Sequence, residues 1–238
     1  MFAALSTSIS YAQIEKTLKF LPEEVDFGLI REENGKVTRY VKAVNISKTP
    51  TFIISARTSC GCSSVDYPDK QIAPGDTVVI SVTYDPVNRP GKFLKTAKIY
   101  TGKERIGNSF KLKGNVIPSK KNLDRAYPVK SGKLRLSSQI INAGEVSTQE
   151  ARPLFVGIYN DSDRSLKISA NTDSTPLEAG LTPDSIGPFE ISTLTLMLKG
   201  RLFKKNEKDF FYKAYLIDGM SGDTITSIPV GGTIRKKN

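Results

Sequence analysis

The sequence contains two cysteines, Cys60 and Cys62, with only Gly61 between them, and it contains no histidine. Two thiols at this spacing could form a local disulfide, exchange with other thiols, or hold a soft ion such as Cu(I). The lack of histidine excludes Ser-His-Asp and Cys-His nucleophilic sites, and a tetrahedral zinc site would need two further ligands. The cysteine pair is therefore the candidate for special chemistry. We expect no catalytic residues, no cofactor and no metal-binding residues.

The spacing of Cys60 and Cys62 leaves three interpretations open. In an extended strand, residues i and i+2 lie about 6.5–7 Å apart on one side, at the limit of a disulfide, although Gly61 permits a tighter turn. A disulfide that closes a three-residue loop stabilises the folded state by only about 1.6 kcal/mol, against about 4–5 kcal/mol for one that closes a long loop. Strain would make such a bond readily reducible. The pair is thus structural (buried thiols or a local disulfide), redox-responsive, or a metal ligand. We predict that the two cysteines lie close together at one end of their domain and bind no metal.

The chain surrounding this pair is repeated once. The offsets between matching segments are 114 to 118 residues, and a period above about 100 residues indicates a duplicated domain rather than a solenoid of 20–50-residue repeats. At the position of Cys60-Gly61-Cys62 the second copy has Ser174-Thr175-Pro176. The matching segments are residues 27–28 and 143–144, 41–45 and 156–160, 71–75 and 185–189, and 110–116 and 228–234.

Strand patterns dominate both copies. Apolar and polar residues alternate in 77–84 and again in 193–198, which is the period of a strand with one face on a core. Turn signals such as Asn34-Gly35 and Pro90-Gly91 separate the alternating rows, and no stretch shows a helical period. Around seven short strands in about 100 residues predict an immunoglobulin-like antiparallel β-sandwich, without the Cys–Trp–Cys core of antibody domains.

We therefore predict an all-β chain of two tandem immunoglobulin-like sandwiches. Their predicted bounds are residues 18–117 and 133–238, with a lead-in at 1–17 and a polar linker at 118–132. The predicted core of the first domain consists of Phe27, Val41, Phe52, Ile54, Ile80, Val82, Leu112 and Val116. The predicted core of the second consists of Val156, Ile158, Ile168, Leu194, Leu196, Val230 and Ile234.

Three spaced segments of the first copy resemble a known family. They are Thr58-Ser59-Cys60-Gly61-Cys62-Ser63-Ser64, Ile72-Ala73-Pro74-Gly75-Asp76 and Ile80-Ser81-Val82-Thr83-Tyr84-Asp85. The pattern is similar to a domain-of-unknown-function family of exported bacterial proteins, which in turn resembles the Hydin-type (ASH) immunoglobulin-like domains. The resemblance covers residues 20–117, and the second copy lacks both cysteines. It implies an immunoglobulin-like fold and an envelope location, but no activity and no site residues beyond Cys60 and Cys62.

The positive charge of the chain is spread evenly. Residues 18–117 carry 16 basic and 10 acidic side chains, a net of +6, and residues 118–238 carry 18 and 13, a net of +5. A nucleic-acid-binding protein usually concentrates its basic residues on one stripe, so we expect no nucleic-acid partner. No apolar run approaches the length of about 18–20 residues that a spanning helix needs, so we expect no membrane span.

The N-terminus resembles the tail of a signal peptide. Residues 1–9 form a short apolar stretch of small residues. Ser10-Tyr11-Ala12 fits the small-x-small cleavage pattern, with Gln13 as the first mature residue. A basic n-region is missing, which leaves open whether Met1 is the true start. We expect a periplasmic, cell-surface or secreted protein.

Four sites match the Asp-Ser/Thr-apolar acceptor used for O-glycosylation in some Gram-negative envelopes, with acceptors at Thr77, Ser174, Ser185 and Thr224. Asn45 and Asn160 begin sequons for N-glycosylation. Because these two asparagines sit at equivalent turns, we predict instead that they hydrogen-bond the turn backbone.

These features predict a non-catalytic binding or structural module of the bacterial envelope. Its partner would be an envelope protein, a glycan or a second copy of the chain. The alternative is a periplasmic thiol-redox or copper-handling protein that uses Cys60 and Cys62.

Overall fold

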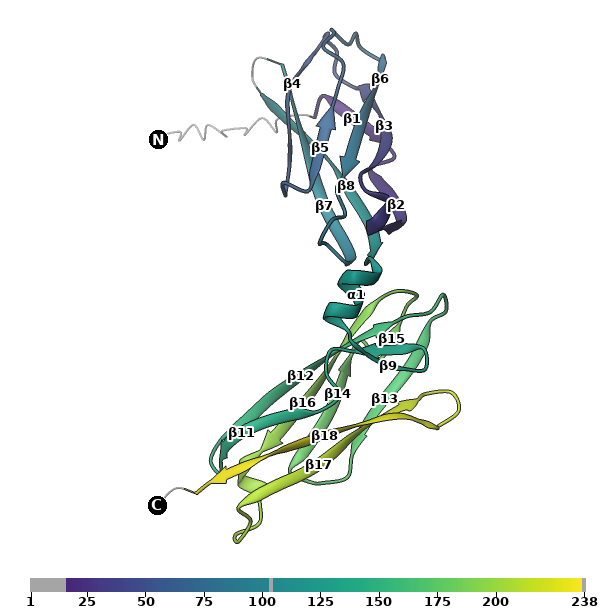
Figure 1. The fold of residues 1–238 in the computed structure, drawn as a ribbon. Helices are drawn as coiled ribbons and strands as arrows, with labels where there is room; N and C mark the ends of the chain where they lie inside the picture. The colour runs from purple at the N-terminus through teal and green to yellow at the C-terminus, as the bar shows by residue number, and fades with distance from the viewer. Residues whose placement is uncertain (1–15, 103–104, 237–238) are drawn as a thin grey trace, which may run out of the picture. The chain divides into compact units, whose positions relative to one another are not determined.

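The computed structural model describes residues 16–102 and 105–236, and the regular secondary structure of these residues is almost entirely β-strand (Figure 1). The chain divides into two compact units: the first contains the described residues up to Val87 and Lys92–Val116, and the second contains Asn88–Gly91 and the described residues from Ile117 onward. Each unit consists of two sheets around its own hydrophobic core, which confirms the prediction of two all-β sandwich domains. The predicted signal peptide falls on residues 1–12, outside the described part of the chain.

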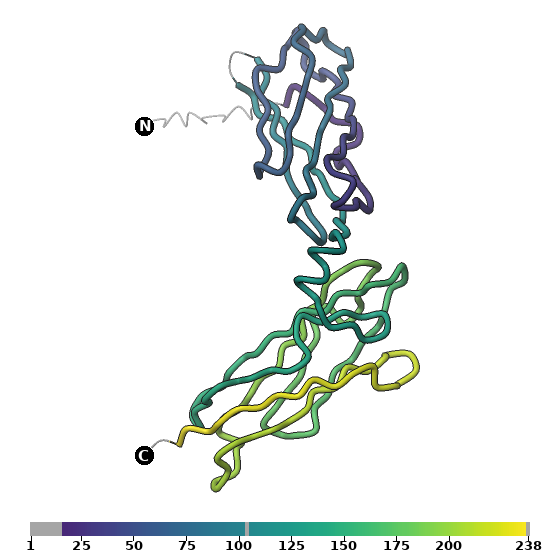
Figure 2. The backbone as a smooth tube through the Cα atoms, in the orientation of Figure 1, coloured from purple at the N-terminus to yellow at the C-terminus, as the bar shows by residue number. Residues whose placement is uncertain are grey.

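The first domain pairs two four-stranded sheets. The first sheet has the order β1-β3-β6-β5 and the second the order β2-β8-β7-β4, so consecutive strands often lie in different sheets, as Figure 2 lets the reader follow. A short 3-10 turn, Glu32–Asn34, follows β2. The strands are β1 (Leu18–Leu21), β2 (Glu24–Arg31), β3 (Val37–Asn45), β4 (Ile53–Thr58), β5 (Ser63–Asp66), β6 (Thr77–Tyr84), β7 (Gly91–Thr101) and β8 (Ile106–Ile117).

The second domain pairs two five-stranded sheets, of order β14-β16-β12-β10-β9 and β11-β18-β17-β13-β15. β11 runs parallel to β18, and β12 pairs antiparallel with β16 over nearly its whole length. A 3-10 turn spans Gly200–Leu202. The strands are β9 (Val129–Ser131), β10 (Leu134–Leu136), β11 (Ile141–Ser147), β12 (Ala151–Asn160), β13 (Leu166–Thr172), β14 (Leu177–Thr182), β15 (Ser185–Ile186), β16 (Ile191–Lys199), β17 (Asp209–Asp218) and β18 (Thr224–Arg235).

The core of the first domain agrees with the alternating pattern except in β4. Phe52 is 38% exposed and Ile54 only partly buried, whereas Ile53 between them is buried. The pairing of β4 with β7 shifts register between Ile53 and Ser55, and such a bulge moves the residues before it to the opposite face. The other predicted core residues are buried: Phe27, Val41, Ile80, Val82, Leu112 and Val116.

The core of the second domain agrees with prediction at six positions, and Ile234 packs against it while partly exposed. The six are buried: Val156, Ile158, Ile168, Leu194, Leu196 and Val230.

The segment predicted to be a linker, residues 118–132, forms part of the second domain. It holds α1 (Lys120–Ala126), capped by the hydroxyl of Ser119, and β9, which pairs with β10. The helix buries Leu123, and Asp124 forms a 2.7 Å ion pair with Arg135 of β10. The segment was predicted to be a linker because its composition is polar, and that composition gives no sign of these two contacts. Within the described ranges, no helix combines the length and apolarity that crossing a membrane requires.

Candidate functional site

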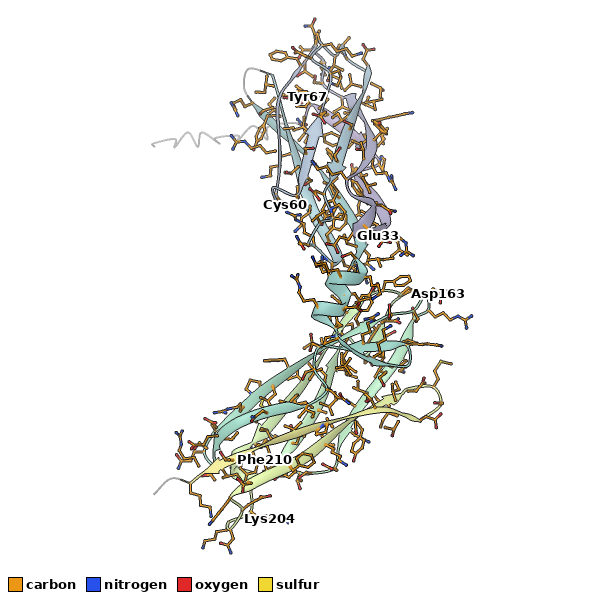
Figure 3. All side chains as sticks on the ribbon, in the orientation of Figure 1. Glu33, Cys60, Tyr67, Asp163, Lys204 and Phe210 are labelled. Atoms are coloured by element: carbon orange, nitrogen blue, oxygen red, sulfur yellow. A yellow bond between two sulfur atoms is a disulfide. The ribbon has the colours of Figure 1, made fainter. Side chains whose placement is uncertain are left out.

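The two cysteines lie in the loop through which the chain passes from one sheet of the first domain to the other. We call residues 59–62 the crossover loop; β4 ends immediately before it and β5 begins immediately after it. Cys60 and Cys62 are joined by a disulfide with a Cα–Cα distance of 5.3 Å. Of the structural forms that the sequence left open, the local disulfide is the one present. Cys60, labelled in Figure 3, is partly exposed, whereas Cys62 is 4% exposed and belongs to the hydrophobic core.

Hydrogen bonds hold the crossover loop at both ends. The hydroxyl of Thr58 lies 2.7 Å from the carbonyl oxygen of Cys60 and 2.8 Å from that of Ser63. The amide of Ser59 donates to the carbonyl of Thr96 on β7 at 3.0 Å, and its hydroxyl accepts from the amide of Thr96 at 3.1 Å. The carbonyl of Cys62 accepts from the amide of Asp85 at 2.8 Å. These contacts fix the loop against strands of both sheets.

The second domain builds the same loop without a disulfide. The hydroxyl of Thr172 lies 3.2 Å from the carbonyl oxygen of Ser174 and 2.6 Å from that of Leu177. Asp173 exchanges two hydrogen bonds with Lys213 of β17: its amide donates to the Lys213 carbonyl at 3.1 Å, and its carboxylate accepts from the Lys213 amide at 2.8 Å. Ser174 is partly exposed, like Cys60 at the equivalent position, and Pro176 is buried, like Cys62. The loop conformation therefore does not require a disulfide.

We predict that removing the disulfide has a small effect on stability. Replacing Cys60 with Ser and the buried Cys62 with Ala should lower the free energy of unfolding by about 1–2 kcal/mol, because so short a loop removes little entropy from the unfolded chain. Chemical denaturation of the wild type and the double variant measures the difference. A loss of about 4 kcal/mol or more would show that the disulfide is a principal structural bond of the domain, contrary to the prediction.

The oxidised pair offers a metal ion no thiolate, which is the form of cysteine that binds metals. Over the ranges that the structure describes, no three His, Cys, Asp or Glu side chains gather in a way that could hold a metal ion. The proposal that the isolated protein binds no metal stays a prediction, to be tested by elemental analysis.

The four predicted O-glycosylation acceptors are spread over both domains. Thr77, Ser185 and Thr224 are exposed, each at the first residue of a strand, β6, β15 and β18 respectively. Ser174 lies partly exposed in the loop equivalent to the crossover loop. Modification of these hydroxyls stays a prediction.

Asn45 and Asn160 serve the turn backbone, as predicted from their positions. The side-chain amide of Asn45 donates to the carbonyls of Thr49 and Ile72, and its oxygen accepts from the amide and hydroxyl of Ser47. The side chain of Asn160 makes the corresponding bonds at the equivalent turn of the second domain. Both residues are buried.

A surface hollow of about 680 Å³, not predicted from the sequence, lies on the sheet formed by β2, β8 and β7 of the first domain. Leu29 and Leu94 contribute exposed apolar surface, 56% and 61% exposed. Lys113 pairs with Glu24 at 2.6 Å and with Asp26 at 3.7 Å; the hydrogen bond to Glu24, above all, raises the pKa of Lys113. Apolar residues at outward positions of two strands were the signal in the sequence. The lining residues are Glu24, Asp26, Gly28, Leu29, Lys92, Phe93, Leu94, Lys113, Gly114 and Asn115.

Among known protein families, one family model matches the first domain. Residues 18–116 match the family model described as "Protein of unknown function (DUF1573)". No curated protein matches the chain. The family has no established activity, so the match assigns none to this chain.

Several solved structures resemble the chain at low sequence identity. A Porphyromonas gingivalis W83 protein of unknown function has 14% identity and a TM-score of 0.40, covering 92% of this chain and 100% of that one. The ASH/PapD-like domain 7 of human CEP192 has 10% identity and a TM-score of 0.36 (50% and 99% covered). The YadV chaperone has 14% identity and a TM-score of 0.34 (89% and 98% covered). With TM-scores this low, the likenesses add nothing to the fold described above.

Proposed function

We propose that this chain is a non-catalytic recognition module of the bacterial cell envelope that binds a segment of another envelope protein in the hollow of the first domain. The observation that carries the proposal is the exposure of Leu29 and Leu94 around one hollow. Apolar residues grouped at a concave surface and bordered by charged ones are typical of interaction sites. The ion pair of Lys113 with Glu24 lies at the border of this apolar surface.

The chemistry of the chain supports a role without catalysis. It has no histidine, so Ser-His-Asp and Cys-His nucleophilic sites are excluded. An immunoglobulin-like sandwich offers loops, faces and sheet edges for binding, although a fold by itself does not determine a function. The envelope location rests on the signal-peptide pattern of the sequence and on the resemblance of the first copy to a family of exported bacterial proteins.

Two single variants test the binding surface. We expect Leu29→Glu and Leu94→Glu each to abolish capture of a partner from envelope extract, because a carboxylate in the apolar hollow would have to be desolvated. Both positions are exposed in the free chain, so folding should be unaffected. Met220→Glu is the matched control, since Met220 is an exposed apolar side chain of the second domain, 90% exposed.

The outcomes separate the alternatives. Unchanged capture by both leucine variants would contradict a role for the hollow. Capture that disappears after enzymatic removal of glycans from the extract would identify a glycan as the partner. Recovery of the protein from the cytosolic fraction alone would refute the envelope location.

A further inference from the structure

We propose that the Cys60–Cys62 disulfide is a thiol–disulfide exchange site, at which the thiolate of a dithiol substrate attacks the sulfur of Cys60. The proposed recognition role does not use this disulfide, so the inference goes beyond it. The substrate class is a protein or small molecule that carries two neighbouring thiols.

The duplicated chain supplies the first argument. A disulfide that cycles between oxidised and reduced forms must be able to break without unfolding its surroundings. The crossover loop is held by the bonds of Thr58 and Ser59. The second domain holds the equivalent loop with the corresponding bonds of Thr172 and Asp173 and with further backbone bonds, without a disulfide. Because hydrogen bonds suffice in one copy, the conformation of the other should survive reduction.

The unequal burial of the two sulfur-bearing residues supplies the second argument. An attacking thiolate must approach a disulfide sulfur from solvent, and access decides which sulfur reacts. Cys60 is partly exposed, whereas Cys62 is 4% exposed within the core. Attack is therefore confined to Cys60, and Cys62 is the leaving group.

The surroundings of Cys60 favour an anionic nucleophile. Arg57 of β4 lies directly opposite Lys98 of β7, near the crossover loop, and both side chains are exposed. Two exposed cations at this edge, close in sequence to the crossover loop, attract an approaching thiolate. The hydroxyl of Ser63 lies 3.6 Å from the sulfur of Cys60.

The reaction balances in two steps. The substrate thiolate forms a bond to the sulfur of Cys60 while the Cys60–Cys62 bond breaks, and Cys62 leaves with the electron pair and takes a proton from water. The second thiol of the substrate, after losing its proton to water, then attacks the substrate sulfur of the mixed disulfide and releases Cys60 as a thiolate. The substrate is oxidised to a disulfide, and the cysteine pair gains its two electrons.

Reduction under native conditions is the first test. We expect dithiothreitol to release both thiols of the wild-type chain while circular dichroism and the first domain's unfolding transition stay close to those of the oxidised protein. Release of thiols only in denaturant, or loss of the folded signal upon reduction, would overturn the proposal.

Single variants test which sulfur reacts. With oxidised glutathione as the probe, we expect Cys62→Ser to form a mixed disulfide at Cys60 at least about tenfold faster than Cys60→Ser forms one at Cys62, because only Cys60 is accessible. Equal rates in the two folded variants would contradict the assignment of Cys60 as the attacked sulfur.

A matched control comes from the second copy. Ser174→Cys with Pro176→Cys places a cysteine pair in the equivalent loop, at one partly exposed and one buried position. That loop has Asn171 opposite Tyr215 in place of the facing Arg57 and Lys98, and its neighbouring Lys213 is accompanied by the acidic Asp173. We therefore expect dithiothreitol to reduce an introduced disulfide several-fold more slowly than the native one. Equal reduction rates for the native and the introduced disulfide would contradict the role that we assign to Arg57 and Lys98.

Discussion

Asn160→Ala is expected to lower the free energy of unfolding of the second domain by about 4 kcal/mol, because each buried polar group left without a partner costs about 1–3 kcal/mol. Asn160 has no exposed surface. Its side-chain amide lies 2.6 Å from the carbonyl oxygen of Arg164, 3.0 Å from that of Ile186 and 2.9 Å from that of Gly187. Its oxygen accepts from the amide of Ser162 at 3.1 Å and from the hydroxyl at 2.6 Å. One substitution removes all of these contacts.

Denaturant titration of the domain's transition measures the effect, and two further variants frame it. Asn45→Ala should destabilise the first domain in the same way, because it removes the equivalent bonds. Asn142→Ala is the control: Asn142 is exposed and makes one backbone bond, to Gly144 at 2.8 Å, so its loss should cost about 1 kcal/mol or less. If Asn160→Ala had no larger effect than Asn142→Ala, the turn would not depend on the buried amide.

The sequence alone could predict the two sandwiches and most of their cores, because alternation with a period of two is imposed by the strand backbone itself. Ile80 and Val82 follow this rule in a regular ladder with β3. Phe52 does not, because the bulge in β4 depends on the pairing with β7, and this partner is more than 40 positions away in the sequence. A local pattern contains no information about such a shift of register.

The candidate sites likewise include residues that the local sequence indicates and residues that only the folded chain brings together. Composition and spacing identified Cys60 and Cys62, and equivalent turn positions identified Asn45 and Asn160. The bonds of Thr58 to the crossover loop, and the gathering of Leu29 and Leu94 around one hollow, depend on the path of the chain between two sheets. The duplication could have indicated the first of these, since a threonine precedes the loop in both copies.

Arg135→Ala is expected to destabilise the second domain by about 3 kcal/mol, because charge-assisted hydrogen bonds contribute about 1.5–3 kcal/mol each. Arg135 is 5% exposed, and its guanidinium binds Asp124 of α1 at 2.7 Å and Asp161, after β12, at 2.6 Å. The two carboxylates are themselves partly exposed, so water can solvate them once the arginine is gone. The loss is therefore that of the hydrogen bonds and packing.

Two variants separate geometry from charge in thermal or denaturant unfolding. Arg135→Lys should recover only part of the stability, because an ammonium group cannot present the planar fork that joins two carboxylates. Arg235→Ala is the control, since Arg235 and its partner Glu145 are both largely exposed and such pairs contribute about 1 kcal/mol or less. Equal effects of Arg135→Ala and Arg235→Ala would show that the buried guanidinium does not hold α1 on the domain.

The same cluster predicts how stability depends on acid. Hydrogen bonds from Lys120 and then from Arg135 lower the pKa of Asp124 from 3.8 to about 2. A carboxyl whose pKa is lower in the folded state stabilises the fold above its unfolded pKa, and that contribution is lost as the pH falls through the folded value. Stability should therefore decrease between pH 3.8 and about 2, and Asp124→Asn should reduce this decrease relative to the wild type. An unchanged acid dependence in Asp124→Asn would contradict a stabilising role for the charge of Asp124 on α1.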